Sequence, residues 1–167
     1  MYNWYYSNHF SIHFLNTSIL SFIENVYSYT GGAHGNAGVI GHNYFLSPSY
    51  QLNIENLFEF DDTEIVLQFI SDFCYEELRK IYNEGLEISE EEIKLQDKSI
   101  FWEGSLDLKW ENFNNVIMSR DSLSIIFNQY QVSSYAFGIQ IIDIPLNNLL
   151  KLKINTSKLE RLIEIMK

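Results

Sequence analysis

The residues with the richest chemistry lie in one glycine-rich stretch, Ser28-Tyr-Thr-Gly-Gly-Ala-His-Gly-Asn36. Five of the eight glycines of the chain fall within residues 31–41. Glycine loses more backbone entropy on folding than any other residue, so such a cluster indicates positive φ angles or a close approach to another group. An imidazole in the middle, His34, adds a group that can transfer a proton or contact a ligand. We therefore expect any site of this chain to include this turn.

Two interpretations of His34 remain open on the sequence. In the first, its ring bonds to loop carbonyls and only holds the glycine turn in shape. In the second, it is a recognition residue, or a general base assisted by a nearby carboxylate. The density of special residues around it favours a functional role.

A second cluster is Phe127-Asn-Gln-Tyr-Gln-Val-Ser-Ser-Tyr-Ala-Phe-Gly138. Tyr130 and Tyr135 lie in a polar link between two expected strands, and Gly138 falls inside the second strand, where a glycine often marks a bulge or a close contact. Exposed loop tyrosines bury much area on binding at low entropic cost. The alternative is that these rings simply pack over the end of the sheet.

Other reactive side chains do not form a recognisable site. His9 and His13 lie on one strand roughly 13 Å apart, too far to share a metal ion. Cys74, the only cysteine, falls on the apolar face of a helix, where a thiol has a raised pKa and is inert. Glu90–Glu92 lack the alternating ligands of a calcium loop, and no zinc-protease, P-loop or nucleophile-elbow motif occurs. We expect no catalytic residue, no metal and no cofactor.

The composition limits the partners. The chain has 167 residues, enough for one domain, with 22 acidic and 11 basic residues and a net charge of −11. This excess of acid argues against binding to nucleic acid or to anionic membranes. It favours a cationic partner, or serves only to keep the protein in solution.

No sequence signal places the chain in or across a membrane. No run of about 18 apolar residues occurs, so we expect no membrane span. The first residues lack the basic and apolar regions of a signal peptide. On the sequence alone, the protein is cytoplasmic or is a domain of a longer precursor.

The elements that must position these clusters indicate an α+β fold, with a mostly antiparallel sheet packed by one long helix over about 62–84 and short C-terminal helices. β-branched, aromatic and alternating patterns predict the strands. These strands are 9–14, 19–29, 43–46, 113–118, 123–128 and 135–144.

The long helix is predicted from a capping box, Asp61 with Glu64, and an apolar stripe. The stripe consists of Ile65, Val66, Phe69, Ile70, Phe73, Cys74, Leu78, Ile81 and Tyr82. An acidic, solvated connection is expected over 85–105. Near the C-terminus, Pro145 precedes a short helix over 146–152, and a second capping box, Ser157 with Glu160, begins an amphipathic helix.

Four segments, taken in order, resemble a known family. They are Tyr29-Thr-Gly-Gly-Ala-His-Gly35, Leu52-Asn-Ile-Glu-Asn-Leu-Phe58, Ile126-Phe-Asn-Gln-Tyr-Gln-Val-Ser-Ser-Tyr-Ala-Phe-Gly138 and Ile144-Pro-Leu-Asn-Asn-Leu149. The chain is similar, over about residues 19–152, to a bacterial domain-of-unknown-function family. This family is found at the C-terminus of RsiV-type anti-sigma factors and in PdaC-type peptidoglycan deacetylases.

The resemblance implies an α+β domain outside the cytoplasmic membrane, periplasmic or extracellular. In the RsiV-type relatives it is a sensor that binds lysozyme without catalysis of its own. The resemblance also implies that the turn at 30–35 and the link at 129–135 lie side by side. The binding residues would be Tyr29, Thr30, His34, Asn36, Gln129, Tyr130 and Tyr135.

We therefore expect a single domain over 1–152 followed by a helical extension over 153–167. Its expected function is a non-catalytic binding or sensor module of a bacterial envelope protein, recognising lysozyme or cell-wall glycan. One alternative is a hydrolase or transferase acting on wall material through His34. Another is a spacer domain with no ligand.

Overall fold

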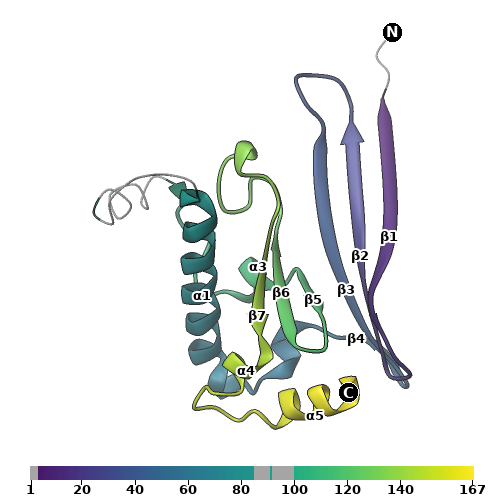
Figure 1. Cartoon of the computed structure of the whole chain (residues 1–167), viewed down its shortest axis with the longest axis vertical. Coiled ribbons are helices and arrows are strands. Elements are labelled where there is room, and N and C mark those ends of the chain that lie inside the picture. The colour runs from purple at the N-terminus through teal and green to yellow at the C-terminus, as the bar shows by residue number, and fades with distance from the viewer. Residues whose placement is uncertain (1–3, 85–90, 92–99) are drawn as a thin grey trace.

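The computed structural model describes residues 4–84, 91 and 100–167 and has the predicted α+β architecture (Figure 1). Two antiparallel sheets lie next to each other, and a long helix packs on the side of the smaller sheet away from the larger one. The acidic connection expected over 85–105 falls largely outside the described residues. No helix in the described part of the chain is long and apolar enough to span a membrane.

The larger sheet has four strands in the order β1-β2-β3-β4, each antiparallel to its neighbour. The strands are β1 (Tyr5–Leu15), β2 (Ile19–Tyr29), β3 (Asn36–Leu46) and β4 (Ser49–Gln51). The strand predicted over 19–29 is confirmed, whereas β1 is longer than 9–14. The prediction for β3 was wrong at its start: the strand begins at Asn36, not at residue 43. Gly38 and Gly41 belong to this strand and not to the turn.

The smaller sheet has the order β5-β6-β7. Its strands are β5 (Val116–Met118), β6 (Ser122–Phe127) and β7 (Gln140–Pro145). Two predicted strands were too long. Residues 110–113 form the short helix α3 (Trp110–Phe113), and Tyr135–Phe137 form a 3-10 turn, so the strand predicted over 135–144 starts only at Gln140. Gly138, with φ 76°, separates this 3-10 turn from the strand.

The long helix α1 spans Thr63–Asn83, close to the predicted 62–84. Its buried side chains follow helical spacing, as expected of a helix with one apolar face. They are Val66, Leu67, Ile70, Cys74 and Leu78. The predicted stripe was too wide, because Ile65, Ile81 and Tyr82 are exposed. The expected Asp61–Glu64 capping box does not form: the helix is preceded by a 3-10 turn, Phe60–Asp62, and its N-cap residue is Asp62.

Cys74 lies in the centre of the core with no exposed surface, and burial raises the pKa of its thiol to about 12. The thiolate is the reactive form of cysteine. We therefore expect the folded protein to resist modification by Ellman's reagent at pH 8 and the urea-unfolded protein to react fully. Rapid release of one equivalent of chromophore from the folded protein would contradict this placement.

Two short helices close the chain below the sheets (Figure 1). Helix α4 (Leu146–Leu149) is shorter than the predicted 146–152, and α5 spans Ser157–Met166. The predicted Ser157–Glu160 capping box was wrong: Thr156 is the N-cap residue, and its hydroxyl donates to Glu160 at 2.7 Å. The apolar face of α5 is buried in the same core as α1. The domain boundary expected at residue 152 stays a prediction.

Side-chain amides join the two sheets along the free edge of β3. Asn115 accepts a hydrogen bond from the Gly41 amide at 2.9 Å and donates to the Val39 carbonyl at 2.8 Å. Asn128 makes the same pair of contacts with Val39, at 2.7 and 3.0 Å. An unpaired strand edge exposes backbone donors and acceptors that need partners. Here the partners are side chains that flank β5 and β6 of the second sheet, so the edge of β3 is used to fix how the sheets pack.

A hydrogen-bonded cluster around Glu24 lies on the face of the four-stranded sheet that carries Phe22 and Ile40. The Glu24 carboxylate accepts hydrogen bonds from His42 at 2.8 Å and from Asn8 at 2.7 Å. These bonds, the one from His42 first, lower the pKa of Glu24 from its ordinary value of 4.5. A carboxyl group with a lowered pKa stabilises the fold above its ordinary pKa, and this contribution is lost as the pH falls through the folded-state value.

We therefore expect Glu24→Gln to cost more stability at pH 7 than at pH 3, because the contribution of the ionised carboxylate declines as the pH falls from the ordinary pKa of this group towards its lowered folded-state value. Urea unfolding at the two pH values measures the difference. An equal cost at both pH values would contradict the role of the ionised carboxylate.

Candidate functional site

The turn after β2 and the link between β6 and β7 lie toward the same end of the molecule (Figure 1), and side chains of the two segments are in contact. The His34 ring stacks on the Tyr135 ring with centroids 3.9 Å apart and an interplanar angle of 23°. The Tyr135 hydroxyl also donates to the Gly35 carbonyl at 3.2 Å. Two segments that are 100 residues apart in sequence are thus held together by direct contacts.

The glycines give the turn its shape. Gly31 and Gly32 have φ angles of 101° and 105°, which L side chains rarely adopt. The Tyr29 hydroxyl closes the turn by donating to the Gly32 carbonyl at 3.0 Å. Gly35 is buried against the ring of Tyr27, whose hydroxyl would lie 2.3 Å from an added Cβ. The backbone here leaves no room for another residue type at Gly35 unless Tyr27 moves.

The Gln129 side chain makes a hydrogen bond within the protein. Its side-chain carbonyl accepts a hydrogen bond from the Ala37 amide at 3.1 Å, next to the Asn128 contacts with Val39. The residue therefore fastens the β6–β7 link to β3. The other two expected binding residues, Thr30 and Asn36, are exposed on either side of the glycine turn.

A continuous row of rings runs across this junction. From Tyr135 it continues to Tyr130, with ring centroids 5.6 Å apart, and then to Trp102, whose ring stacks on Tyr130 at 6.1 Å. We call the four residues Trp102, Tyr130, Tyr135 and His34 the aromatic row. Trp102 is 46% exposed and Tyr130 is 47% exposed, so a ligand can reach both residues.

Trp102 was missed by the sequence analysis. Residue 102 lay in a segment expected to be a solvated acidic connection. In the structure its backbone amide donates to the Val132 carbonyl at 3.0 Å, and Ser133 donates to the Ile100 carbonyl at 2.8 Å. A tryptophan among acidic residues was the available signal, because such a large apolar ring needs a packing or binding partner.

Tyr130 has an uncommon backbone conformation. Its φ of 64° is positive, and among the described residues it is the only non-glycine residue with this property. A bulky residue pays on the order of 1–3 kcal/mol for the left-handed region and keeps it only where the surrounding structure enforces it. Such strained residues cluster at functional sites, so the conformation of Tyr130 favours a functional role for the β6–β7 link.

The surroundings of His34 bear on catalysis. Its Nδ1 atom lies 3.1 Å from the Gly35 carbonyl, so this nitrogen is placed to donate, and Nε2 makes no hydrogen bond to a residue that the structure describes. Within the described residues, no Asp or Glu carboxylate bonds to His34, and no group of three or more His, Cys, Asp or Glu side chains is placed to hold a metal ion. The arrangement can stack a flat ligand surface and exchange hydrogen bonds with it.

The chain has recognisable relatives. The family described as "Protein of unknown function (DUF3298)" matches residues 55–147, which include the β6–β7 link but not the glycine turn. The peptidoglycan-N-acetylmuramic acid deacetylase PdaC of Bacillus subtilis (strain 168) is 30% identical over 133 residues. This match covers 80% of the present chain and 26% of the deacetylase, so the chain spans about a quarter of that protein.

Two solved structures share the fold. A member of the DUF3298 family from Bacteroides fragilis NCTC 9343 superposes with a TM-score of 0.70 at 19% identity, covering 98% of this chain and 58% of that one. A DUF3298 family protein from Pseudomonas aeruginosa PAO1 superposes with a TM-score of 0.64 at 14% identity, covering 88% and 61%. At these identities the likeness concerns the fold alone.

Proposed function

The chain belongs to the DUF3298 family of proteins of unknown function, and from that premise we propose that it is a non-catalytic module that binds cell-wall glycan through the aromatic row. Its place of action would be outside the cytoplasmic membrane, in the periplasm or at the cell surface, where this polymer lies. The relation to a peptidoglycan deacetylase supports the choice of polymer.

The single observation that carries the proposal is the row of four rings with spacings of 3.9, 5.6 and 6.1 Å. The C–H-rich faces of sugar rings pack on aromatic faces, and tyrosine and tryptophan each add a polar atom that can bond to a sugar hydroxyl. A row supplied by three segments of chain offers the outward-facing surfaces and edges of several rings in succession. This suits a linear polymer better than an isolated ring would.

The local structure also favours a preorganised surface. Three features fix the rings before a ligand arrives. They are the hydrogen bond from the Ala37 amide to Gln129, the stack of His34 on Tyr135 and the positive φ of Tyr130. Rings that are already fixed lose little conformational entropy on binding.

A role in binding explains His34 more simply than a role in hydrolysis does. General base catalysis of the kind considered above needs a carboxylate within hydrogen-bond reach of the imidazole. His34 instead bonds to a carbonyl and stacks on Tyr135. Its proposed role is to extend the row and present Nε2 to the ligand.

A second candidate ligand is a basic protein such as lysozyme, as in RsiV-type sensors. The net charge of −11 favours this candidate, since opposite charge speeds the encounter and aligns the partners. The two candidates use the same surface but differ in their dependence on salt. Binding to a basic protein would weaken strongly with added salt, whereas stacking on a glycan strand, which carries no positive charge, would not weaken.

The test is an affinity measurement with soluble peptidoglycan glycan strands, with c-type lysozyme titrated in parallel. We expect Tyr130→Ala and Trp102→Ala each to weaken glycan binding at least about tenfold, because each removes one face of the row. Isothermal titration calorimetry gives both affinities.

Tyr6→Ala is the matched control. Tyr6 is 64% exposed and lies on β1, outside the row, so its loss should leave the affinity unchanged. Binding of lysozyme alone would favour the second candidate. Binding of neither ligand would leave the chain as a spacer domain.

A further inference from the structure

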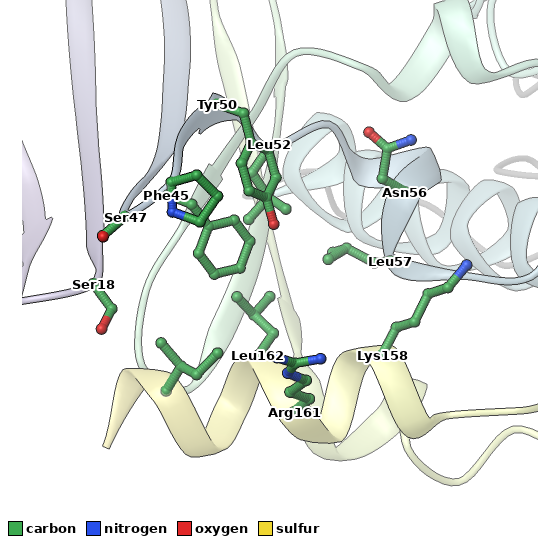
Figure 2. A pocket seen from close by; sticks show the side chains of 12 residues that line it. Ser18, Phe45, Ser47, Tyr50, Leu52, Asn56, Leu57, Lys158, Arg161 and Leu162 are labelled. Carbon is green, nitrogen blue, oxygen red and sulfur yellow. The ribbon is translucent and has the colours of Figure 1, made fainter.

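A pocket of about 360 Å³ lies at the opposite end of the molecule from the aromatic row, between α5 and the turn joining β3 to β4 (Figure 2). Helix α5 forms its floor, and side chains around the β3–β4 turn form the facing wall. This volume is at the small end of the range for ligand sites in proteins. The ligand it would hold is therefore small.

The walls of the pocket are mostly apolar. Phe45 and Tyr50 lie with ring centroids 4.8 Å apart on one side, and Leu57 and Leu162 face them across the opening (Figure 2). Apolar walls with a few polar groups at the mouth are typical of sites for small organic molecules.

The charge of the pocket is opposite to that of the protein. The chain has twice as many acidic as basic residues, yet the charged residues that line this pocket are both cations, Lys158 and Arg161. Lys158 is already engaged: its ammonium donates to the Phe58 carbonyl at 3.1 Å and pairs with Glu59 at 3.1 Å. Arg161 has no hydrogen bond or ion pair with any residue that the structure describes.

Polar contacts bind both ends of α5, which forms the floor of the pocket, to neighbouring segments. At the C-terminal end, the Asn16 amide donates to the Ile165 carbonyl at 2.7 Å, which satisfies one of the free carbonyls of a helix end. At the N-terminal end, the Asp62 carboxylate accepts the Asn155 amide at 3.0 Å. Both ends of the helix are therefore bonded to neighbouring segments, the β1–β2 turn and the residue before α1, and these bonds oppose a shift of the helix into the pocket.

We propose that this pocket binds a small amphiphilic carboxylate, with its apolar chain between Phe45 and Leu162 and its carboxylate on the guanidinium of Arg161. A planar guanidinium is suited to a carboxylate because it can donate two parallel hydrogen bonds. The Tyr50 hydroxyl, also at the pocket, supplies a further donor. This site is independent of the aromatic row and of the glycan that we propose for it.

Sodium octanoate is the probe for the test, and octyltrimethylammonium, with the same chain and the opposite charge, is the control ligand. Methyl NMR signals of Leu57, Leu162 and Ile165 report on the pocket directly. We expect octanoate to shift these signals in a saturable way, and octyltrimethylammonium to leave them in place. Equal shifts with both ligands, or none with octanoate, would overturn the proposal.

Two charge-matched variants complete the test. Arg161→Gln should weaken octanoate binding about tenfold or more, since it removes a charge-assisted hydrogen bond. Lys80→Gln removes the same charge from the exposed side of α1, where Lys80 pairs with Glu77, and should have no effect. An equal loss in both variants would show that only the overall charge matters and would overturn the assignment to Arg161.

Discussion

Gly41→Ala is expected to destabilise the protein by about 4 kcal/mol or to prevent folding. An added Cβ at this position would lie 1.9 Å from the Val116 carbonyl oxygen and 2.5 Å from its carbonyl carbon. Neither chain can move aside, because Asn43 bonds to this same oxygen at 2.9 Å and Asn115 bonds to the Gly41 amide at 2.9 Å. The two sheets would have to separate, at the expense of the core between them.

Gly38→Ala is the matched control for this prediction. Gly38 is in the same strand, and the nearest atom to an added Cβ, Asn128 Oδ1, is 3.9 Å away, at ordinary contact distance. We expect a change within about 1 kcal/mol, since alanine is favoured over glycine in a strand interior. Urea unfolding followed by circular dichroism measures both variants. Similar stabilities for the two would show that the sheets do not pack as closely as described.

Asn43→Asp is expected to cost about 3 kcal/mol or more at neutral pH. Asn43 is buried between the sheets, where its carbonyl accepts bonds from the Ser21 hydroxyl at 2.8 Å and the Met118 amide at 3.0 Å. Its amide group donates to the Val116 carbonyl at 2.9 Å. The aspartate side chain has the same shape but carries an oxygen in place of this donor. That oxygen would face the Val116 carbonyl oxygen, and the side chain would bury a negative charge without a cationic partner.

Asn53→Asp provides the comparison for Asn43→Asp. Asn53 is exposed, and its side chain makes no capping bond to the 3-10 turn that follows it, Ile54–Leu57. We expect a change of less than about 0.5 kcal/mol. Urea unfolding of both variants at pH 7 checks the difference. A cost at Asn43 no larger than at Asn53 would contradict the role of Asn43 in joining the sheets.

The parts of the fold that depend on local pattern could be predicted from the sequence. Helix α1 (Thr63–Asn83) and strand β2 (Ile19–Tyr29) were placed within a residue or two because their apolar spacing extends over many residues. The error at β3 has a physical cause. Glycine usually marks a turn, but Gly41 lies in a strand. This strand position is a glycine because the Val116 backbone passes too close to leave room for any side chain.

The contacts between distant segments could not be read from the sequence in the same way. Asn115 and Asn128 resemble ordinary loop polar residues, and only the packing of the sheets shows that they satisfy the edge of β3. The glycine turn and the tyrosine link were identified as special by composition, and a family resemblance implied that they were neighbours. Trp102 joins them through a backbone contact with Val132, which no sequence pattern indicates.

The most direct test of the proposed glycan site uses the three tryptophans of the chain, Trp4, Trp102 and Trp110. Each indole N–H gives its own signal in a ¹⁵N–¹H spectrum, and only Trp102 belongs to the aromatic row. On titration with soluble glycan strands, we predict a saturable shift of the Trp102 signal while the signals of Trp4 and Trp110 stay in place. A shift confined to Trp4 or Trp110, or no shift at saturating glycan, would contradict the account.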